Sequence, residues 1–298
     1  MNYLTTFKDK FEEIKKKVLK SKIMEGFEEE DEEVAASESY NFGRGENHSS
    51  RDSDMFDTGG YSTKRIKNAA NKNGASVILH NTRAFQSYLK NDKYTELSQN
   101  SSFLLADGVP ISWLGKLHGF PNIEHIRGIT LFKKLMSKIN LEKQNIRVCM
   151  IVSTEKIKDE IFKKIRAEYS EITELEIIVA PWGKAEEIVS DVSCKIENFK
   201  PGFVWVCLGA PKQDEVGSLL REINPSIITL SVGVVAEYFA GLVKPAPKIF
   251  VNLKMEWFFR ILVQPKRAVN FIFPFLTMSK LLLIALPRFF FKESSKNG

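Results

Sequence analysis

The sequence predicts an α/β protein: a Rossmann-like parallel sheet with helices on both faces, followed by a basic, aromatic C-terminal appendage that contacts a membrane. Between residues 63 and 241, short apolar runs alternate with stretches of helical length. Continuous apolar strands separated by helices are typical of a parallel sheet covered on both faces. Residues 1–62 and 242–298 depart from this pattern, so we predict an N-terminal extension, a core and an appendage with these bounds.

The predicted core begins with a helix over residues 64–71. Six apolar runs predict strands over residues 76–79, 103–105, 146–152, 175–179, 203–208 and 227–232. Stretches with apolar residues at helical spacing predict helices over residues 84–98, 111–117, 131–139, 156–169, 185–199 and 213–223. Because crossovers between parallel strands are right-handed, this alternation predicts a layered domain.

The N-terminal extension is expected to be largely disordered. It contains a charged stretch over residues 8–22, an acidic run over residues 28–33, and then mainly Ser, Gly, Asn and Asp. Such a composition buries too little apolar surface to offset chain entropy. The extension has no continuous apolar segment of the secretory type. The three cysteines have no C-x-x-C spacing, which fits a reducing cytosol and argues against a zinc site or a disulfide framework.

Positive charge is concentrated in the appendage. The whole chain of 298 residues has a net charge of +6, but residues 242–298 contain ten Lys or Arg and only two acidic residues. This asymmetry predicts an anionic partner, which the charge alone leaves open between nucleic acid, acidic lipid and phosphate.

Aromatic residues are interleaved with these cations. The apolar run over residues 271–286 is shorter than the roughly 20 residues of a transmembrane helix, and Lys280 lies near its middle. Rings and cations together suit the membrane interface. A helix packed on the core and a homo-oligomer contact are the alternatives.

Polar residues follow five of the predicted strands, and we expect them to meet because parallel strands share one carboxyl edge, where substrates of open α/β sheets bind. Each taken alone is more typical of a turn or a helix cap. The segments are His80-Asn81, Asp107-Gly108, Pro181-Trp182-Gly183, the stretch from Gly209 to Asp214, and the stretch from Gly233 to Glu237.

Six motifs occur in an order that resembles the WecG/TagA/CpsF family, glycosyltransferase family 26, over about residues 64–270. They are Asn81, Ala106-Asp107-Gly108, Arg127-Gly128, Gly209-Ala210-Pro211-Lys212-Gln213, Ala240-Gly241 with Ala246-Pro247, and Glu256-Trp257-x-x-Arg260 with Pro265-Lys266-Arg267.

The resemblance implies an inverting, UDP-sugar-dependent hexosyltransferase of envelope or exopolysaccharide synthesis. Its donor would be a UDP-sugar of N-acetylmannosamine or a related hexose, and its acceptor a polyprenyl-pyrophosphate-linked saccharide. The enzyme would lie peripherally on the inner face of the cytoplasmic membrane. It would need no cofactor or metal, and the core has no D-x-D motif.

The residues agree with this chemistry. Asp107 can take the acceptor proton as general base, and cations at Arg260, Lys266 and Arg267 can stabilise the departing diphosphate. Asn81 and Gln213 can bind sugar or nucleotide hydroxyls. The other substrate-binding candidates are Gly108, Arg127, Gly209, Lys212 and Glu237.

Two departures from the family pattern support an alternative. Leu79 stands where the family often has Thr, and Asn270 where many members have Arg. They favour a non-catalytic relative that binds a nucleotide-sugar or lipid carrier. Nucleic-acid binding is disfavoured because no groove-reading or base-stacking motif accompanies the basic tail.

Overall fold

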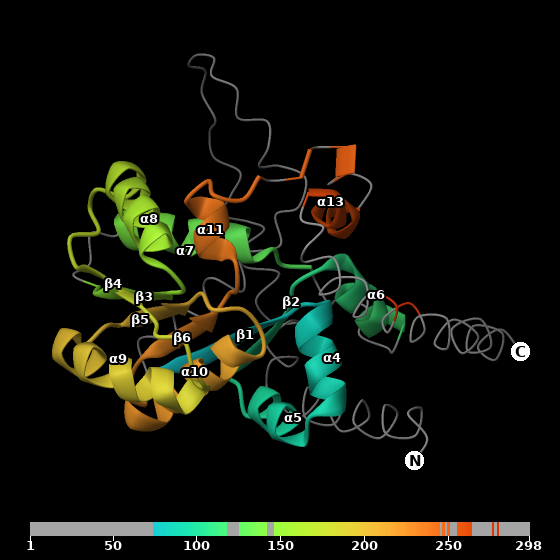
Figure 1. Cartoon of the computed structure of the whole chain (residues 1–298), viewed down its shortest axis with the longest axis horizontal. Coiled ribbons are helices and arrows are strands. Elements are labelled where there is room, and N and C mark those ends of the chain that lie inside the picture. Colours follow the sequence, from blue (N-terminus) through green and yellow to red (C-terminus); the bar gives the residue numbers. More distant parts are fainter. Residues whose placement is uncertain are drawn as a thin grey trace, which may run out of the picture. The chain divides into compact units, whose positions relative to one another are not determined.

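The computed structural model describes residues 74–117, 125–141, 146–244, 246–247, 249–250, 255–263, 276 and 279. All of them belong to one compact unit, Thr58–Gly298. At its centre is a six-stranded sheet in the order β2-β1-β6-β5-β3-β4 (Figure 1). Every neighbouring pair of strands is parallel, which confirms the predicted fold class of an α/β protein with a parallel sheet.

Each strand begins and ends within two residues of its predicted bounds. The strands are β1 (Ala75–His80), β2 (Phe103–Ala106), β3 (Val148–Val152), β4 (Leu175–Val179), β5 (Phe203–Val206) and β6 (Ile228–Ser231). The four central strands are buried along their whole length, whereas the edge strands β2 and β4 are only partly buried. The continuous apolar runs of the central strands are explained by this burial on both faces.

Alternate strand residues build two hydrophobic layers. Val148, Met150 and Val152 of β3 belong to one layer, and Cys149 and Ile151 to the other. The first layer is covered by α7 (Gly128–Leu141), α8 (Glu155–Glu168) and α11 (Val235–Phe239). The second is covered by α9 (Ala185–Phe199) and α10 (Lys212–Ile223) (Figure 1). The prediction of helices on both faces is therefore confirmed.

The helix predicted over residues 84–98 is two helices, and this part of the prediction was wrong. They are α4 (Thr82–Lys90), which packs against β1, and α5 (Asp92–Gln99), which packs against α10. Asn91 separates them because its backbone is extended, with φ −128° and ψ 112°. Its side-chain oxygen accepts from the N–H of Tyr94 at 3.3 Å and caps α5.

Two described helices remain, one within the core and one beyond it. Helix α6 (Val109–Leu117) follows β2 as predicted, and α13 (Glu256–Val263) lies in the segment predicted as the appendage. Within the described residues, no helix combines the length and apolar character needed to cross a membrane. The N-terminal extension, the helix over residues 64–71 and most of the appendage lie outside the described residues.

Candidate active site

The predicted site residues of the core lie at the carboxyl edge of the sheet. Because all six strands are parallel, the turns that follow β1, β2, β4, β5 and β6 leave the sheet at the same edge. This edge is where open α/β sheets bind their substrates. The segments therefore share one edge of the sheet, but β2 and β4 are its two outermost strands, so the turns that follow them lie at opposite ends of that edge.

Asp107 follows β2 directly and is partly buried. Its backbone N–H donates to the carbonyl of His80 at 2.9 Å, which fixes the end of β2 against the end of β1. Gly108 has φ +115°, a conformation that favours glycine, and its carbonyl accepts from the N–H of Ile111 at 3.1 Å. The chain therefore turns into α6 immediately after the carboxylate.

Arg127 is brought beside this turn from a distant part of the sequence. His125 pairs with Ala106 in an isolated parallel bridge, and the N–H of Ile126 donates to the Ala106 carbonyl at 2.9 Å. The carbonyl of Arg127 accepts from the N–H groups of Thr130 and Leu131 and begins α7. Asp107 and Arg127 are thus neighbours at the end of β2.

The first turn of α7 approaches the sheet closely at Gly128. A Cβ atom there would lie 2.9 Å from Val235 Cγ2 and 3.2 Å from Leu79 Cδ2. Leu79 is 1% exposed and belongs to the hydrophobic layer under α7. The departure from the family pattern at Leu79 therefore adds an apolar side chain beneath the helix that begins beside Asp107.

Asn81 caps α4. Its Oδ1 accepts from the backbone N–H groups of Arg83 and Ala84, each at 3.0 Å. A capping asparagine contributes typically about 1 kcal/mol to stability. This contact gives Asn81 a structural role, and its binding of substrate remains a prediction.

Gln213 connects the turns after β5 and β6. It is 1% exposed, and its Oε1 accepts from the N–H of Gly209 at 3.1 Å. The same oxygen would lie 3.6 Å from a Cβ atom placed on Gly233. Glu237, on α11, is close enough to β5 that its negative charge adds to burial in raising the pKa of the Cys207 thiol.

Lys212 holds the loop after β4 against the start of α10. Its Nζ donates to the carbonyl of Gly183 at 2.7 Å and lies 5.1 Å from the ring centroid of Trp182. The indole of Trp182 is 99% exposed, so this cation–π contact leaves the ring open to solvent. The ammonium group predicted to bind substrate therefore already has partners within the protein.

A buried polar cluster beneath this edge was not predicted. The hydroxyl of Tyr94, on α5, donates to Asp214 Oδ2, on α10, at 2.5 Å. The ring of His80 stacks on that of Tyr94 with centroids 6.0 Å apart, and His80 Nε2 lies 3.2 Å from Ser98 Oγ. Burial raises the pKa of Asp214 to about 7 and lowers the pKa of His80 to about 3.

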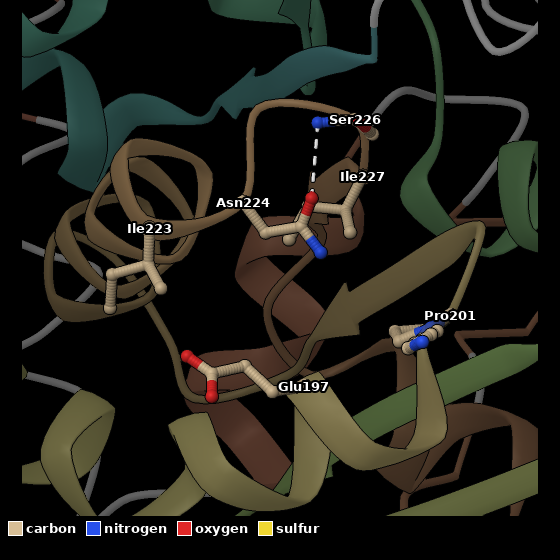
Figure 2. A pocket seen from close by; sticks show the side chains of 7 residues that line it. Glu197, Pro201, Ile223, Asn224, Ser226 and Ile227 are labelled. Carbon is tan, nitrogen blue, oxygen red and sulfur yellow. Dashed lines mark hydrogen bonds between the residues drawn. The ribbon is translucent and has the colours of Figure 1, made fainter.

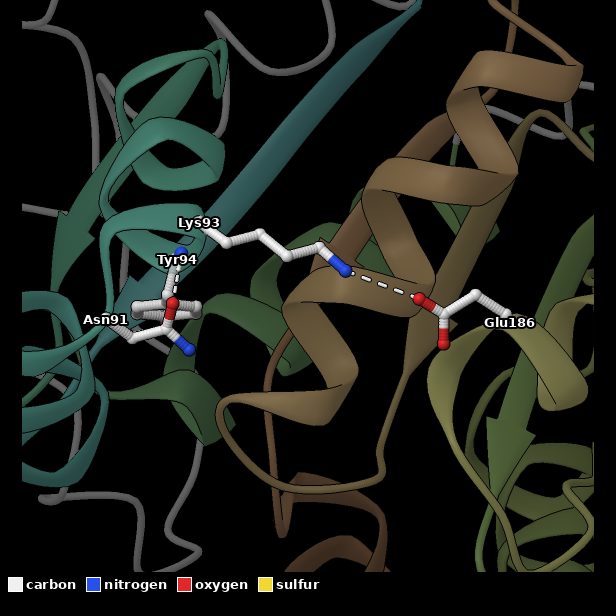
Figure 3. Close-up of polar contacts among 4 residues, drawn as sticks. All are labelled: Asn91, Lys93, Tyr94 and Glu186. Atoms are coloured by element: carbon white, nitrogen blue, oxygen red, sulfur yellow. Dashed lines mark hydrogen bonds and ion pairs between the residues drawn. The ribbon is translucent and has the colours of Figure 1, made fainter.

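The surface near this cluster carries an ion pair. Lys93 Nζ lies 3.3 Å from Glu186 Oε1, joining α5 to α9, while Asn91 and Tyr94 lie nearby on the α5 side (Figure 3). Both partners are more than half exposed. Such pairs contribute about 0–1 kcal/mol, so the buried contact of Tyr94 with Asp214 is the stronger connection between α5 and the rest of the core.

A cavity of about 510 Å³ lies near the amino ends of β5 and β6, between the C-terminal ends of α9 and α10 (Figure 2). None of the predicted site residues in the described part of the chain lines it. Its lining residues are Glu197, Lys200, Pro201, Ile223, Asn224, Ser226 and Ile227. The candidate active site is therefore assigned to the carboxyl edge and not to this cavity.

Three cations are predicted to bind the diphosphate: Arg260, Lys266 and Arg267. The side chain of Arg260, and Lys266 and Arg267 entirely, lie outside the described residues. Within the part of the chain that is described, no group of three or more His, Cys, Asp or Glu side chains could hold a metal ion.

Comparison with known proteins gives the family. Residues 55–294 match the model of the glycosyl transferase WecG/TagA/CpsF family. The chain belongs to this family. Its relatives include N-acetylglucosaminyldiphosphoundecaprenol N-acetyl-β-D-mannosaminyltransferases from three bacteria. That of Bacillus spizizenii is 28% identical over 197 residues, covering 65% of this chain and 73% of the relative.

The other two comparisons are similar in extent. The Bacillus subtilis relative is 27% identical over 199 residues, which are 66% of this chain and 74% of the relative. The Staphylococcus aureus relative is 26% identical over 195 residues, which are 65% and 74%. The chain is thus a WecG/TagA/CpsF glycosyltransferase, as the motifs indicated, and the edge that carries Asp107 is its candidate active site.

Proposed function

We propose that this glycosyltransferase transfers N-acetylmannosamine, or a related hexose, from a UDP-sugar to a polyprenyl-pyrophosphate-linked saccharide. The activity for which the relatives are named supports this choice of donor and acceptor class. The observation that supports the proposal is the position of Asp107, which directly follows β2 at the edge where open α/β sheets bind substrates, with the backbone of Arg127 beside it. The product would enter an envelope or exopolysaccharide polymer.

In the proposed reaction, Asp107 accepts the proton of the acceptor hydroxyl. The hydroxyl oxygen attacks the anomeric carbon from the face opposite the leaving group, and the bond from that carbon to the diphosphate oxygen breaks. The configuration inverts in this single displacement, and UDP departs with the bonding electrons. No metal is required if cationic side chains take up the developing charge.

The appendage over residues 242–298 would supply that charge. Arg260 and Arg267 can each meet two phosphate oxygens with a planar guanidinium, and Lys266 adds a third cation. Gln213, Asn81, Gly108, Gly209, Lys212 and Glu237 would line the donor and acceptor sites. The aromatic and cationic tail would also hold the enzyme on the inner face of the cytoplasmic membrane.

Release of UDP tests the proposal. A panel of UDP-sugars is supplied with and without a lipid-pyrophosphate N-acetylglucosamine acceptor, and acceptor-dependent release identifies the donor. Binding of donor without release from any member of the panel would favour the alternative, a non-catalytic relative, which the substitutions at Leu79 and Asn270 support.

A further inference from the structure

Helix α6 has an exposed face that combines an indole with a cation. Ile111 and Leu114 of α6 are buried, whereas Trp113 is 47% exposed and Lys116 is also exposed. Residues three apart lie on the same side of a helix, so Trp113 and Lys116 share this face. The outward side of α6 therefore presents an aromatic ring and a cation together.

Exposed side chains also occur on β2 and α4, the two elements against which α6 packs. Phe103 and Leu105 pack toward the layer under α7, so Leu104 points to the opposite face of β2, where it is 40% exposed. Helix α6 packs against both β2 and α4, which lie together in Figure 1. Helix α4 adds Arg83 and Lys90, which are both exposed and lie two helical turns apart. We call Arg83, Lys90, Leu104, Trp113 and Lys116 the α4–α6 surface.

The charge of this surface indicates its partner. Neither α4 nor α6 contains an Asp or Glu, so the two helices contribute only cations. Tryptophan at headgroup level, apolar side chains beneath it and cations facing lipid phosphates are the features of an interfacial membrane contact. A second copy of the chain is a poorer partner, because a symmetric contact would place these cations against each other.

A membrane contact at this surface would bring Asp107 close to a lipid-linked acceptor. If the proposed function holds, the acceptor is anchored by its polyprenyl chain, so its reacting hydroxyl remains near the level of the headgroups. Helix α6 begins two residues after Asp107, so the Cα of Val109 lies within about 7 Å of the Cα of Asp107. We infer that the α4–α6 surface rests on anionic lipid and holds Asp107 at the depth of the acceptor.

A fluorescent probe tests this inference in the full chain. Cys194, on α9, is exposed and reacts with a thiol probe such as NBD, whereas Cys149 and Cys207 are buried. Labelled wild type therefore reports α9, which packs against α10. The double variant Cys194→Ser, Trp113→Cys places the same probe on α6.

Phosphatidylglycerol vesicles should raise NBD emission at position 113 at least about twofold and leave it unchanged at position 194. Phosphatidylcholine vesicles should have no effect at either position. The inference is overturned if position 113 does not respond, if both positions respond equally, or if phosphatidylcholine is as effective as phosphatidylglycerol.

A charge reversal provides a second measurement. One unit charge near an anionic bilayer changes binding about fivefold, so Lys116→Glu should weaken binding to phosphatidylglycerol vesicles by at least that factor. Lys156→Glu makes the same change of charge on an exposed residue of α8 and should stay within about twofold of wild type. Equal losses in the two variants would show an effect of total charge and contradict the inference.

Neither experiment contains donor or acceptor, so each is independent of turnover. A responsive probe in a protein without transferase activity would overturn the proposed function and leave the surface assignment intact. A silent probe in an active enzyme would overturn only the surface assignment.

Discussion

Replacing His80 and Asp214 one at a time should change the pH dependence of stability in opposite directions. The two residues lie on either side of Tyr94, which stacks on His80 and donates a hydrogen bond to Asp214. Both are buried, at 4% and 1% exposure. Burial disfavours the charged form of each, so the pKa of the acid rises and the pKa of the base falls.

For Asp214, the pKa is raised from 3.8 to about 7 in the folded protein. Between these values the folded state binds a proton that the unfolded state has released, so this group lowers the free energy of unfolding as pH rises. For His80, the pKa is lowered from 6.5 to about 3. Here the unfolded state binds the extra proton, so this group raises the free energy of unfolding as pH rises.

The two effects nearly cancel in the wild type wherever the pH windows overlap. One proton changes the free energy of unfolding by about 1.36 kcal/mol per pH unit, which is about 2 kcal/mol between about pH 4.5 and pH 6.0. Relative to wild type, Asp214→Asn should therefore gain about 2 kcal/mol over this interval, and His80→Phe should lose about 2 kcal/mol.

Urea unfolding of the full chain, followed by tryptophan fluorescence, measures these changes because Trp205 is fully buried. Tyr94→Phe is the control: it removes the hydrogen bond to Asp214 but no group that titrates in this interval. If the Asp214→Asn and His80→Phe profiles run parallel to wild type, the two groups do not titrate as their burial requires and the reasoning is wrong.

Three further predictions concern the elements that position Asp107. Gly128→Ala should lower the free energy of unfolding by about 1–3 kcal/mol, because its Cβ would press on Val235 and Leu79, and an unchanged urea midpoint would mean that α7 can move away. Leu79→Thr should lower the free energy of unfolding in urea by about 2 kcal/mol or more, because it buries a hydroxyl in the layer under α7. A stability equal to wild type would show that water reaches this position. Asn81→Ala should cost about 1 kcal/mol while Asn81→Asp keeps the cap, and equal losses in the two variants would contradict the capping role.

The strands, and with them the carboxyl edge, could be predicted because a strand buried on both faces is apolar at every position. In β3, for example, residues facing each layer are apolar, so the run is continuous and bounded. The position of Asp107 after β2 followed in the same way. The division at Asn91 was missed because the apolar spacing continues through it, although an asparagine followed by Asp92 is an N-cap signal.

The buried cluster could not be predicted from spacing. Tyr94 and Asp214 meet only because α5 packs against α10, a contact between segments 120 positions apart in the chain. Arg127 lies beside Asp107 because His125 forms an isolated bridge with Ala106. A single bridge of this kind has no periodic pattern in the sequence. The cap at Asn81 is the alternative that the sequence offered for a polar residue after a strand. The carbonyl bound by Lys212 is a backbone group, so the sequence does not show that contact.

The most direct test of the central claim is UDP release by wild type and Asp107→Asn with the lipid-pyrophosphate acceptor. We expect acceptor-dependent release by wild type, and a loss of turnover of at least about 100-fold in the variant, the usual scale for removal of a general base. Donor binding should be retained in the variant, because its amide occupies the same space at the end of β2. Equal turnover by the two proteins would remove Asp107 from the mechanism and contradict the account.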